Sequence, residues 1–394
     1  MPGVTSASLA ITGARLVLAD GVRPGGIVVR DGRIEALLDR GAAPPPDAEL
    51  IDGGGRLLAP GLIDVHVHGG GGFSLMTDDA KQVRGFARWA VSCGVTGFLV
   101  STSGRDHAEI VRRLRALAPL AGAREPGAAR MLGFHLEGPY LNPARKGAFD
   151  PRWLRPPSVR EYEELAAAAG GALRQMTVAP ELPGGLDLVR AVVASGAVAA
   201  IGHTDATYDE ACAAIDAGAS HVTHCFNAMR PFGHRDPGVI GAILTSDALT
   251  AELIGDGAHV HYPAARVLLA AKGMRQLVLV TDGMPLAGTP DGEAEWEGVP
   301  IRVEGGTAVR ASDGTIIGGV TTLDAMARNV ARELGLREHE ALAMASANAA
   351  RAMRLADYGE LRAGAVADFV LLDDGLRISE TWVAGERCWR RSSG

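Results

Sequence analysis

Histidines that follow apolar runs are the residues of this chain best placed for chemistry. His66 and His68 come directly after the apolar run 57–63 and just before four glycines. Because alternate residues of a strand point to the same face, both imidazoles can aim at one point where a strand ends. Imidazole is a common ligand for zinc and iron. A single His-x-His pair is often incidental, so its interpretation depends on what accompanies it.

Four other segments place metal-ligating side chains in the same context. The side chains are Glu137, His203, His224 and Asp282. Each lies at the end of an apolar run of strand length. Buried charges need a charged partner or a metal. Four histidines and two carboxylates in this setting therefore favour a metal site over simple packing.

The remaining histidines are predicted to have structural or surface roles. His135 shares a strand face with Glu137 but lies one layer deeper, so we expect it in the core or behind the ligands. His221 and His224 are three residues apart and cannot share a strand face, and we favour His224 as the ligand. Helix-like or polar contexts place the others at the surface: His107, His234, His261 and His339.

The middle of the chain alternates between strand-like and helix-like stretches. The predicted strands are 62–67, 96–100, 131–136, 175–178, 198–201, 221–226, 251–254 and 276–281. The predicted helices are 78–92, 107–117, 159–169, 186–195, 208–217, 263–271, 323–334 and 338–354. This α/β alternation is typical of a (β/α)8 TIM barrel, whose active sites lie at the C-terminal ends of the strands. The alternative, a doubly wound sheet, would not bring its first and last strands together, although both carry candidate ligands.

Both ends of the chain have a different pattern, with short strands separated by turns. Asp20-Gly21 and Asp31-Gly32 are hairpin signals. We therefore predict a small β-sandwich domain built from residues 1–60 and 361–394. The catalytic barrel is predicted to span residues 61–360.

Composition excludes several classes of partner. The net charge is −7 and no basic stripe is interleaved with aromatic residues, which argues against nucleic acid. The four cysteines form no Cys-x-x-Cys pair, so we expect a reducing, cytoplasmic environment and no thiolate zinc site. We expect no signal peptide and no membrane span, because the first residues lack a basic region and no apolar run reaches about 18 residues.

Longer motifs resemble a known family. They are residues 135–139, 146–147, 202–207, 223–229, 235–238, 256–259 and 280–282. With the His-x-His pair, these segments resemble the amidohydrolase superfamily and, within it, the N-acetylglucosamine-6-phosphate deacetylase family. The resemblance extends from about residue 52 to residue 368.

The resemblance implies how the metal is held. Glu137, His203 and His224 match the metal site common to the family, and His66 and His68 match members that hold a second ion. We include Asp282 among the ligands. Such ligands suit Zn, Fe, Mn and Co alike, so one or two divalent ions of these kinds are expected. The strand 175–178 contains no lysine, which counts against the carbamylated-lysine chemistry of dihydroorotases and hydantoinases.

The implied activity is hydrolysis of the N-acetyl group of N-acetylglucosamine 6-phosphate in amino-sugar catabolism. A bound divalent metal lowers the pKa of water from roughly 16 toward about 7. Asp282 would accept the proton of the water and deliver it to the leaving amine. Two alternatives stay open: a related amidohydrolase acting on another N-acylated amino sugar or amino acid, and a non-catalytic barrel. Retention of all six candidate ligands disfavours the non-catalytic barrel.

Substrate contacts are also implied by the resemblance. Arg235 is expected to reach the substrate phosphate of the neighbouring subunit, which implies a homodimer, and arginine offers fixed planar donors for that role. The full predicted substrate-binding set is Ala148, Asn227, Ala228, Arg235, Asp256, His259 and Gly318.

Three positions depart from the family pattern. Phe149 stands where the family usually has a histidine that polarises the acetyl carbonyl. Gly283 stands where alanine is usual, and Gly319 where serine is usual. The metal and phosphate parts are thus retained, whereas the part facing the acyl group differs. Either a second metal polarises the carbonyl, or the acyl group or the sugar is different.

Overall fold

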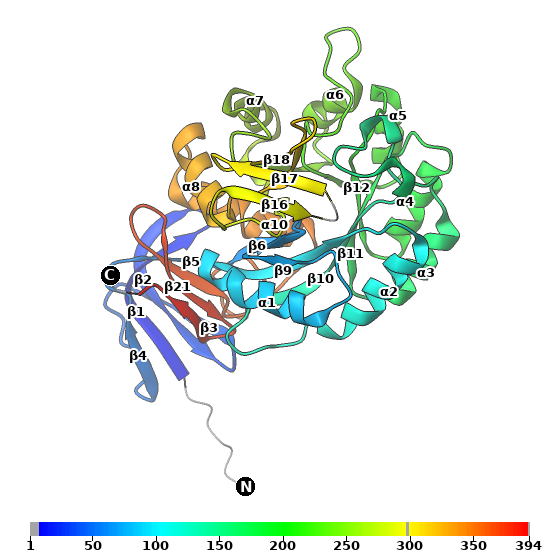
Figure 1. Ribbon diagram of the computed structural model, residues 1–394. Coiled ribbons are helices and arrows are strands. Elements are labelled where there is room, and N and C mark those ends of the chain that lie inside the picture. The colour runs from blue at the N-terminus through cyan, green and yellow to red at the C-terminus, as the bar shows by residue number, and fades with distance from the viewer. Residues whose placement is uncertain (1–7, 297–298, 393–394) are drawn as a thin grey trace.

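Eight parallel strands, five of which end at or just before candidate ligands, form one sheet of the computed structural model, which describes residues 8–296 and 299–392 (Figure 1). Their order in the sheet follows their order in the sequence. They are β6 (Leu62–Asp64), β9 (Val95–Thr102), β10 (Arg130–Glu137), β11 (Leu173–Val178), β12 (Val198–Ile201), β13 (His221–Val222), β14 (Thr250–Ile254) and β15 (Leu277–Val280).

The first and last strands meet just beyond their C-terminal ends, which closes the barrel. Val67 and Gly283 form a parallel bridge. The amide of Asp282 donates to the carbonyl oxygen of His66 at 2.9 Å, and the amide of His68 donates to that of Gly283 at 2.7 Å. An open doubly wound sheet would separate these residues. The predicted (β/α)8 barrel is therefore confirmed.

Helices surround the barrel. They are α1 (Ala80–Ala90), α2 (His107–Leu117), α3 (Val159–Ala168), α4 (Gly185–Ala194), α5 (Tyr208–Asp216), α6 (Gly238–Thr245), α7 (Tyr262–Lys272), α8 (Leu323–Leu334), α9 (Glu338–Met344) and α10 (Ala347–Ala352). The side chains of Asp106, Ser158 and Thr207 cap their helices by accepting from first-turn amides. Among the described residues, no helix combines the length and the apolar character needed to cross a membrane.

Two helical regions differ from the prediction. The single helix predicted over 338–354 is wrong, because Ser346, with φ −141° and ψ −85°, interrupts it between α9 and α10. Helix α6 was not predicted from the sequence, since its residues are apolar all round and give no amphipathic stripe. Six of its eight residues are buried, which explains that composition.

Strands from both termini form one further eight-stranded sheet, seen in Figure 1 as blue and red strands side by side. They are β1 (Ser8–Leu18), β2 (Gly21–Arg30), β3 (Arg33–Asp39), β4 (Ala48–Asp52), β5 (Leu57–Pro60), β20 (Phe369–Leu372), β21 (Ile378–Val383) and β22 (Glu386–Arg390). The antiparallel pair β5–β20 joins the two ends of the chain. The small β domain made from both termini is confirmed; its sandwich form and its boundaries at residues 60 and 361 stay predictions.

An antiparallel sheet that was not predicted is inserted in the sequence between β15 and α8. It consists of β16 (Gly292–Trp296), β17 (Val299–Glu304), β18 (Thr307–Arg310) and β19 (Ile316–Gly319). Its buried residues, including Ile301, Val303 and Ile317, pack with Met284. A bridge between Gly283 and Gly319 attaches it to the end of the barrel. A two-stranded hairpin, β7 (Gly69–Gly70) and β8 (Phe73–Ser74), follows His68.

Candidate active site

All six predicted metal ligands meet at the C-terminal end of the barrel. They form two groups of ligand atoms, each lying within 4.8 Å of one another. The first group is His66, His68, Glu137 and Asp282, and the second is Glu137, His203 and His224. Glu137 belongs to both groups, so its carboxylate would be shared by ions held in the two groups.

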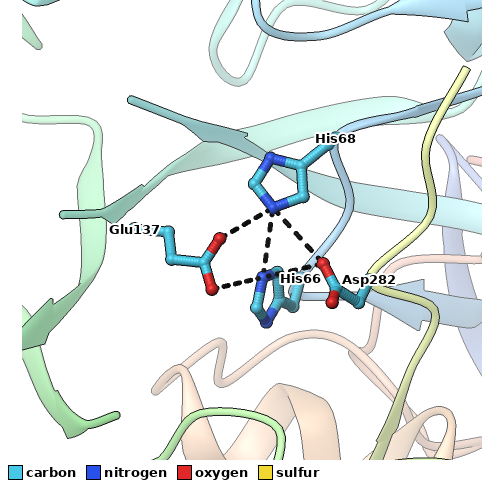
Figure 2. A group of neighbouring side chains, drawn as sticks. All are labelled: His66, His68, Glu137 and Asp282. Atoms are coloured by element: carbon cyan, nitrogen blue, oxygen red, sulfur yellow. Dashed lines mark hydrogen bonds and ion pairs between the residues drawn. The ribbon is translucent and has the colours of Figure 1, made fainter. Parts of the chain in front are cut away.

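The first group is built from three separate strand ends (Figure 2). His68 Nε2 lies 3.0 Å from Glu137 Oε2 and 3.4 Å from Asp282 Oδ1. His66 Nε2 lies 3.3 Å from His68 Nε2, 3.5 Å from Glu137 Oε1 and 3.4 Å from Asp282 Oδ1. Two imidazoles and two carboxylates thus surround one point.

The second group brings two imidazoles onto the other side of the shared carboxylate. Glu137 Oε1 lies 3.1 Å from His203 Nε2 and 3.0 Å from His224 Nε2, and these two nitrogens are 3.0 Å apart. All three side chains are at most 5 % exposed.

The hydrogen bond behind His203 shows that the second group fits a cation. The Nδ1 of His203 lies 2.8 Å from the carbonyl oxygen of Arg145. Because a carbonyl oxygen can only accept, Nδ1 is the donor. In neutral His203, the Nε2 lone pair therefore faces the oxygen of Glu137. Two lone pairs at that distance repel each other unless a cation or a proton lies between them. This tautomer is the one that metal-ligating histidines adopt when their other nitrogen donates.

Three of the ligand residues have a left-handed backbone. The φ angles are +47° for His203, +26° for His224 and +45° for Asp282. Such angles in residues other than glycine cost about 1–3 kcal/mol each and are concentrated at functional sites. The predicted strand 221–226 is wrong beyond Val222 for this reason, because the chain turns out of the sheet at His224 and directs its ring into the barrel mouth.

Charge pairing overrides the effect of burial on the acids. Burial alone would raise the pKa of Glu137, but the charge of His66 and the close contacts with His203 and His224 hold it well below its ordinary value. The pKa of Asp282 is lowered in the same way, against its burial, by His66 and His68. Both carboxyl groups are therefore ionised at neutral pH, which is the form that can bind a cation or accept a proton.

The imidazoles compete with a metal for protons. Burial opposes protonation of His68, yet its hydrogen bonds with Asp282 and Glu137 raise its pKa to about 9. The pKa of His224 is also raised, against burial, by Glu137. A divalent cation binding here must displace these protons, so metal affinity should increase with pH.

The metal groups open into a cavity of about 760 Å³ at the mouth of the barrel. Five of the predicted substrate residues line it together with the ligands: Ala148, Asn227, Ala228, His259 and Gly318. Asp256 instead accepts from His259 Nδ1 at 2.7 Å and so orients that ring. Arg235 is exposed on the loop that projects from the barrel before α6 (Figure 1) and is not among the residues lining this chain's own cavity. Its contact across a subunit boundary stays a prediction.

Phe149 forms part of the cavity wall beside the second group. Its ring packs edge-on against His203, with ring centroids 5.4 Å apart. Other apolar side chains line the same cavity, among them Met76, Trp153 and Met284. The side chain at position 149 thus offers no hydrogen-bond donor to a substrate carbonyl.

The other histidines mostly lie where they were expected. His135 is buried behind the ligands, between Ser101 Oγ at 2.9 Å and Thr177 Oγ1 at 2.8 Å. His234 and His261 are exposed. The surface prediction for His339 is wrong: it is 6 % exposed, because α9 packs against β5 and β15.

Two buried acids of the site were missed from the sequence. Asp64 accepts from Thr281 Oγ1 at 2.6 Å, and burial raises its pKa to about 7. Glu252 is completely buried in β14 and contacts His66. The signal for both was present, since each is an acid inside an apolar run of strand length.

Comparison with known proteins agrees with this geometry. Residues 57–388 match the model of the amidohydrolase family. The chain is 34% identical over 367 residues to N-acetylglucosamine-6-phosphate deacetylase of Bacillus subtilis (strain 168), covering 92% of each chain. It is 35% identical over 359 residues to N-acetylgalactosamine-6-phosphate deacetylase of Escherichia coli O157:H7, covering 91% of this chain and 93% of the relative.

A solved structure is similar over almost the whole chain. It is a mutant of N-acetyl-D-glucosamine-6-phosphate deacetylase from Mycobacterium smegmatis, in complex with N-acetyl-D-glucosamine-6-phosphate. The TM-score is 0.90 at 33% identity, and the match covers 97% of this chain and 99% of the other.

Proposed function

This chain belongs to the amidohydrolase family, and we propose that it hydrolyses N-acetylglucosamine 6-phosphate to glucosamine 6-phosphate and acetate in amino-sugar catabolism. The observation that carries the proposal is the convergence of six metal-ligating side chains at the mouth of a cavity. Relatives of that activity cover nearly the whole chain and support it.

The two groups of ligands would hold one or two divalent ions, for which Zn, Fe, Mn and Co are all suitable. When bound, such an ion supplies Lewis-acid polarisation and acidifies a water molecule. Asp282, ionised and partly open to the cavity, accepts the proton of the attacking water and returns it to the departing amine. The amine leaves poorly without that proton.

The cavity residues supply recognition of the sugar phosphate in this proposal. Asn227, Ala228 and His259 line the cavity together with the ligands. Arg235 of a second subunit would complete the phosphate site, which makes the working unit a homodimer. All four cysteines lie in the described part of the chain and are free, in keeping with a cytoplasmic location.

A second candidate substrate is N-acetylgalactosamine 6-phosphate, because a relative with that name is as similar as the glucosamine relatives. A panel of both sugars, each with and without the 6-phosphate, together with N-acetyl amino acids, tests the proposal. We expect the highest kcat/KM on a 6-phosphorylated N-acetyl hexosamine. Turnover of N-acyl amino acids alone would contradict the proposed function.

Arg235→Ala is expected to raise KM for the phosphorylated sugar about 10- to 100-fold, the value of one charged hydrogen-bonded contact. Any weak activity on the unphosphorylated sugar should stay unchanged. Steady-state kinetics on both sugars measure this, with the exposed His261→Ala as control. A fully active monomer by light scattering at assay concentration would contradict the contribution across subunits.

Phe149→His tests how the acetyl carbonyl is polarised. If the first metal group replaces the missing histidine, the double variant His66→Ala/His68→Ala should lose most of its turnover. Adding Phe149→His should then recover part of the lost kcat. One hydrogen-bond donor to the developing oxyanion contributes about 10²- to 10³-fold to kcat. Full activity of the double variant would show that the first group is not the substitute.

A further inference from the structure

Glu252 of β14 accepts four hydrogen bonds in the barrel interior, behind both groups of ligands. It is 0% exposed and does not line the cavity. Its Oε2 faces His66 Nδ1 at 2.8 Å and accepts from the backbone amide of His224 at 2.9 Å. Its Oε1 lies 3.1 Å from His221 Nε2 and accepts from Gln175 Nε2 at 2.9 Å. Oε2 thus contacts two of the candidate metal ligands, and Oε1 contacts two buried residues that are not ligands.

The contact with His66 determines which ring nitrogen of that ligand is free. An ionised carboxylate can only accept, so His66 Nδ1 carries the proton and donates to Glu252. In neutral His66, the form that can bind a metal, the lone pair of Nε2 then points to the first group, where His68 Nε2 and Asp282 Oδ1 lie 3.3 and 3.4 Å away. A carboxylate behind a ligating histidine fixes its ring and increases its strength as a ligand.

The contact with His224 acts on the second group through the backbone. His224 adopts a φ of +26°, a conformation that needs external support. Its amide donates to Oε2 of Glu252, the same oxygen that accepts from His66. The amide of Cys225 donates to the backbone carbonyl oxygen of Glu252 at 2.9 Å. A shift of this carboxylate would therefore move one ligand from each group.

We propose that Glu252 is a positioning residue that holds His66 and His224 together and makes the two metal groups depend on one carboxylate. The proposal rests on the metal-dependent function proposed above. It predicts that changing Glu252 weakens both metal sites, although Glu252 belongs to neither group.

Zinc titration of the metal-free full-length protein tests the proposal. Glu252→Gln keeps the size of the side chain and removes its charge. We expect it to weaken zinc binding at both groups by about 10- to 100-fold, the usual effect of changing a partner behind a metal ligand. Elemental analysis after equilibration with limiting zinc and a competing chelator measures the affinity, and circular dichroism confirms folding.

Two controls separate positioning from general damage. Gln175→Met removes a buried partner of Glu252 on the side away from the ligands, so zinc affinity should stay within a few-fold of the wild-type value. His68→Ala removes a ligand of the first group alone and should weaken only one site.

Each result decides the matter. Unchanged zinc affinity in Glu252→Gln overturns the proposal, and weakening at a single site overturns the dependence of both groups on one carboxylate. If Glu252→Gln does not fold, Glu252→Asp takes its place: it keeps the charge but its shorter side chain withdraws from His66, and unchanged zinc affinity overturns the proposal equally. Failure of the proposed function would instead appear in the substrate panel, with zinc binding intact.

Discussion

Glu137→Gln is expected to abolish turnover. The loss of kcat should be well above about 100-fold, the upper value for changing a residue that hydrogen-bonds to a metal ligand. Glu137 is the one side chain shared by both groups of ligands, and its oxygens face all four imidazoles at 3.0–3.5 Å. An amide has neither the charge nor the second oxygen needed to bridge two cations. Metal content per subunit and kcat should therefore fall together.

His203→Ala should also abolish turnover, because it weakens metal binding at the second group. The first group should still bind metal. The matched control is His261→Ala, which removes an exposed imidazole outside the cavity. Metal content and turnover of Glu137→Gln at the wild-type level would remove this carboxylate from the site, and the assigned ligand set with it.

Asp282→Asn is expected to keep its metal and lose about 10²- to 10⁴-fold in kcat, the usual contribution of a proton-transfer group. An amide oxygen can still face a cation, but it cannot take up the proton of water. The pKa of Asp282 lies below its ordinary value despite burial, so the carboxylate is in its basic form throughout the neutral range.

Kinetics and elemental analysis on the same preparation separate the two roles of Asp282. Asp187→Asn, a change to an exposed carboxylate on α4, serves as the control. An Asp282→Asn enzyme within a few-fold of the wild-type rate would show that another group transfers the proton. Loss of metal along with rate would make Asp282 chiefly a ligand.

The ligand set could be predicted from the sequence because its signals are local. His66 and His68 lie two residues apart just after an apolar run, and Glu137, His203 and Asp282 each end such a run. The predicted strand 62–67 is too long, since β6 ends at Asp64 and both histidines lie just beyond it. Parallel strands of a closed barrel bring all such ends to one face, so knowing the fold class was enough to bring these residues together. The same reasoning does not give orientation: the left-handed turns at His203 and His224 are visible only in the structure.

Residues whose role depends on partners far along the chain could not be predicted. In the sequence, Glu252 is only an acid inside an apolar run. Its partners come from distant segments: Gln175 lies in β11, His221 in β13, and His66 beyond the end of β6. The buried charge of Glu252 is tolerated only because these donors surround it. The donors come together only when the barrel closes. The sequence by itself determined which side chains can bind metal and at which end of the barrel they lie. The tertiary structure alone decided which ring nitrogen of His66 and of His203 faces the other candidate ligands, because Glu252 and the carbonyl oxygen of Arg145 accept from the opposite nitrogen.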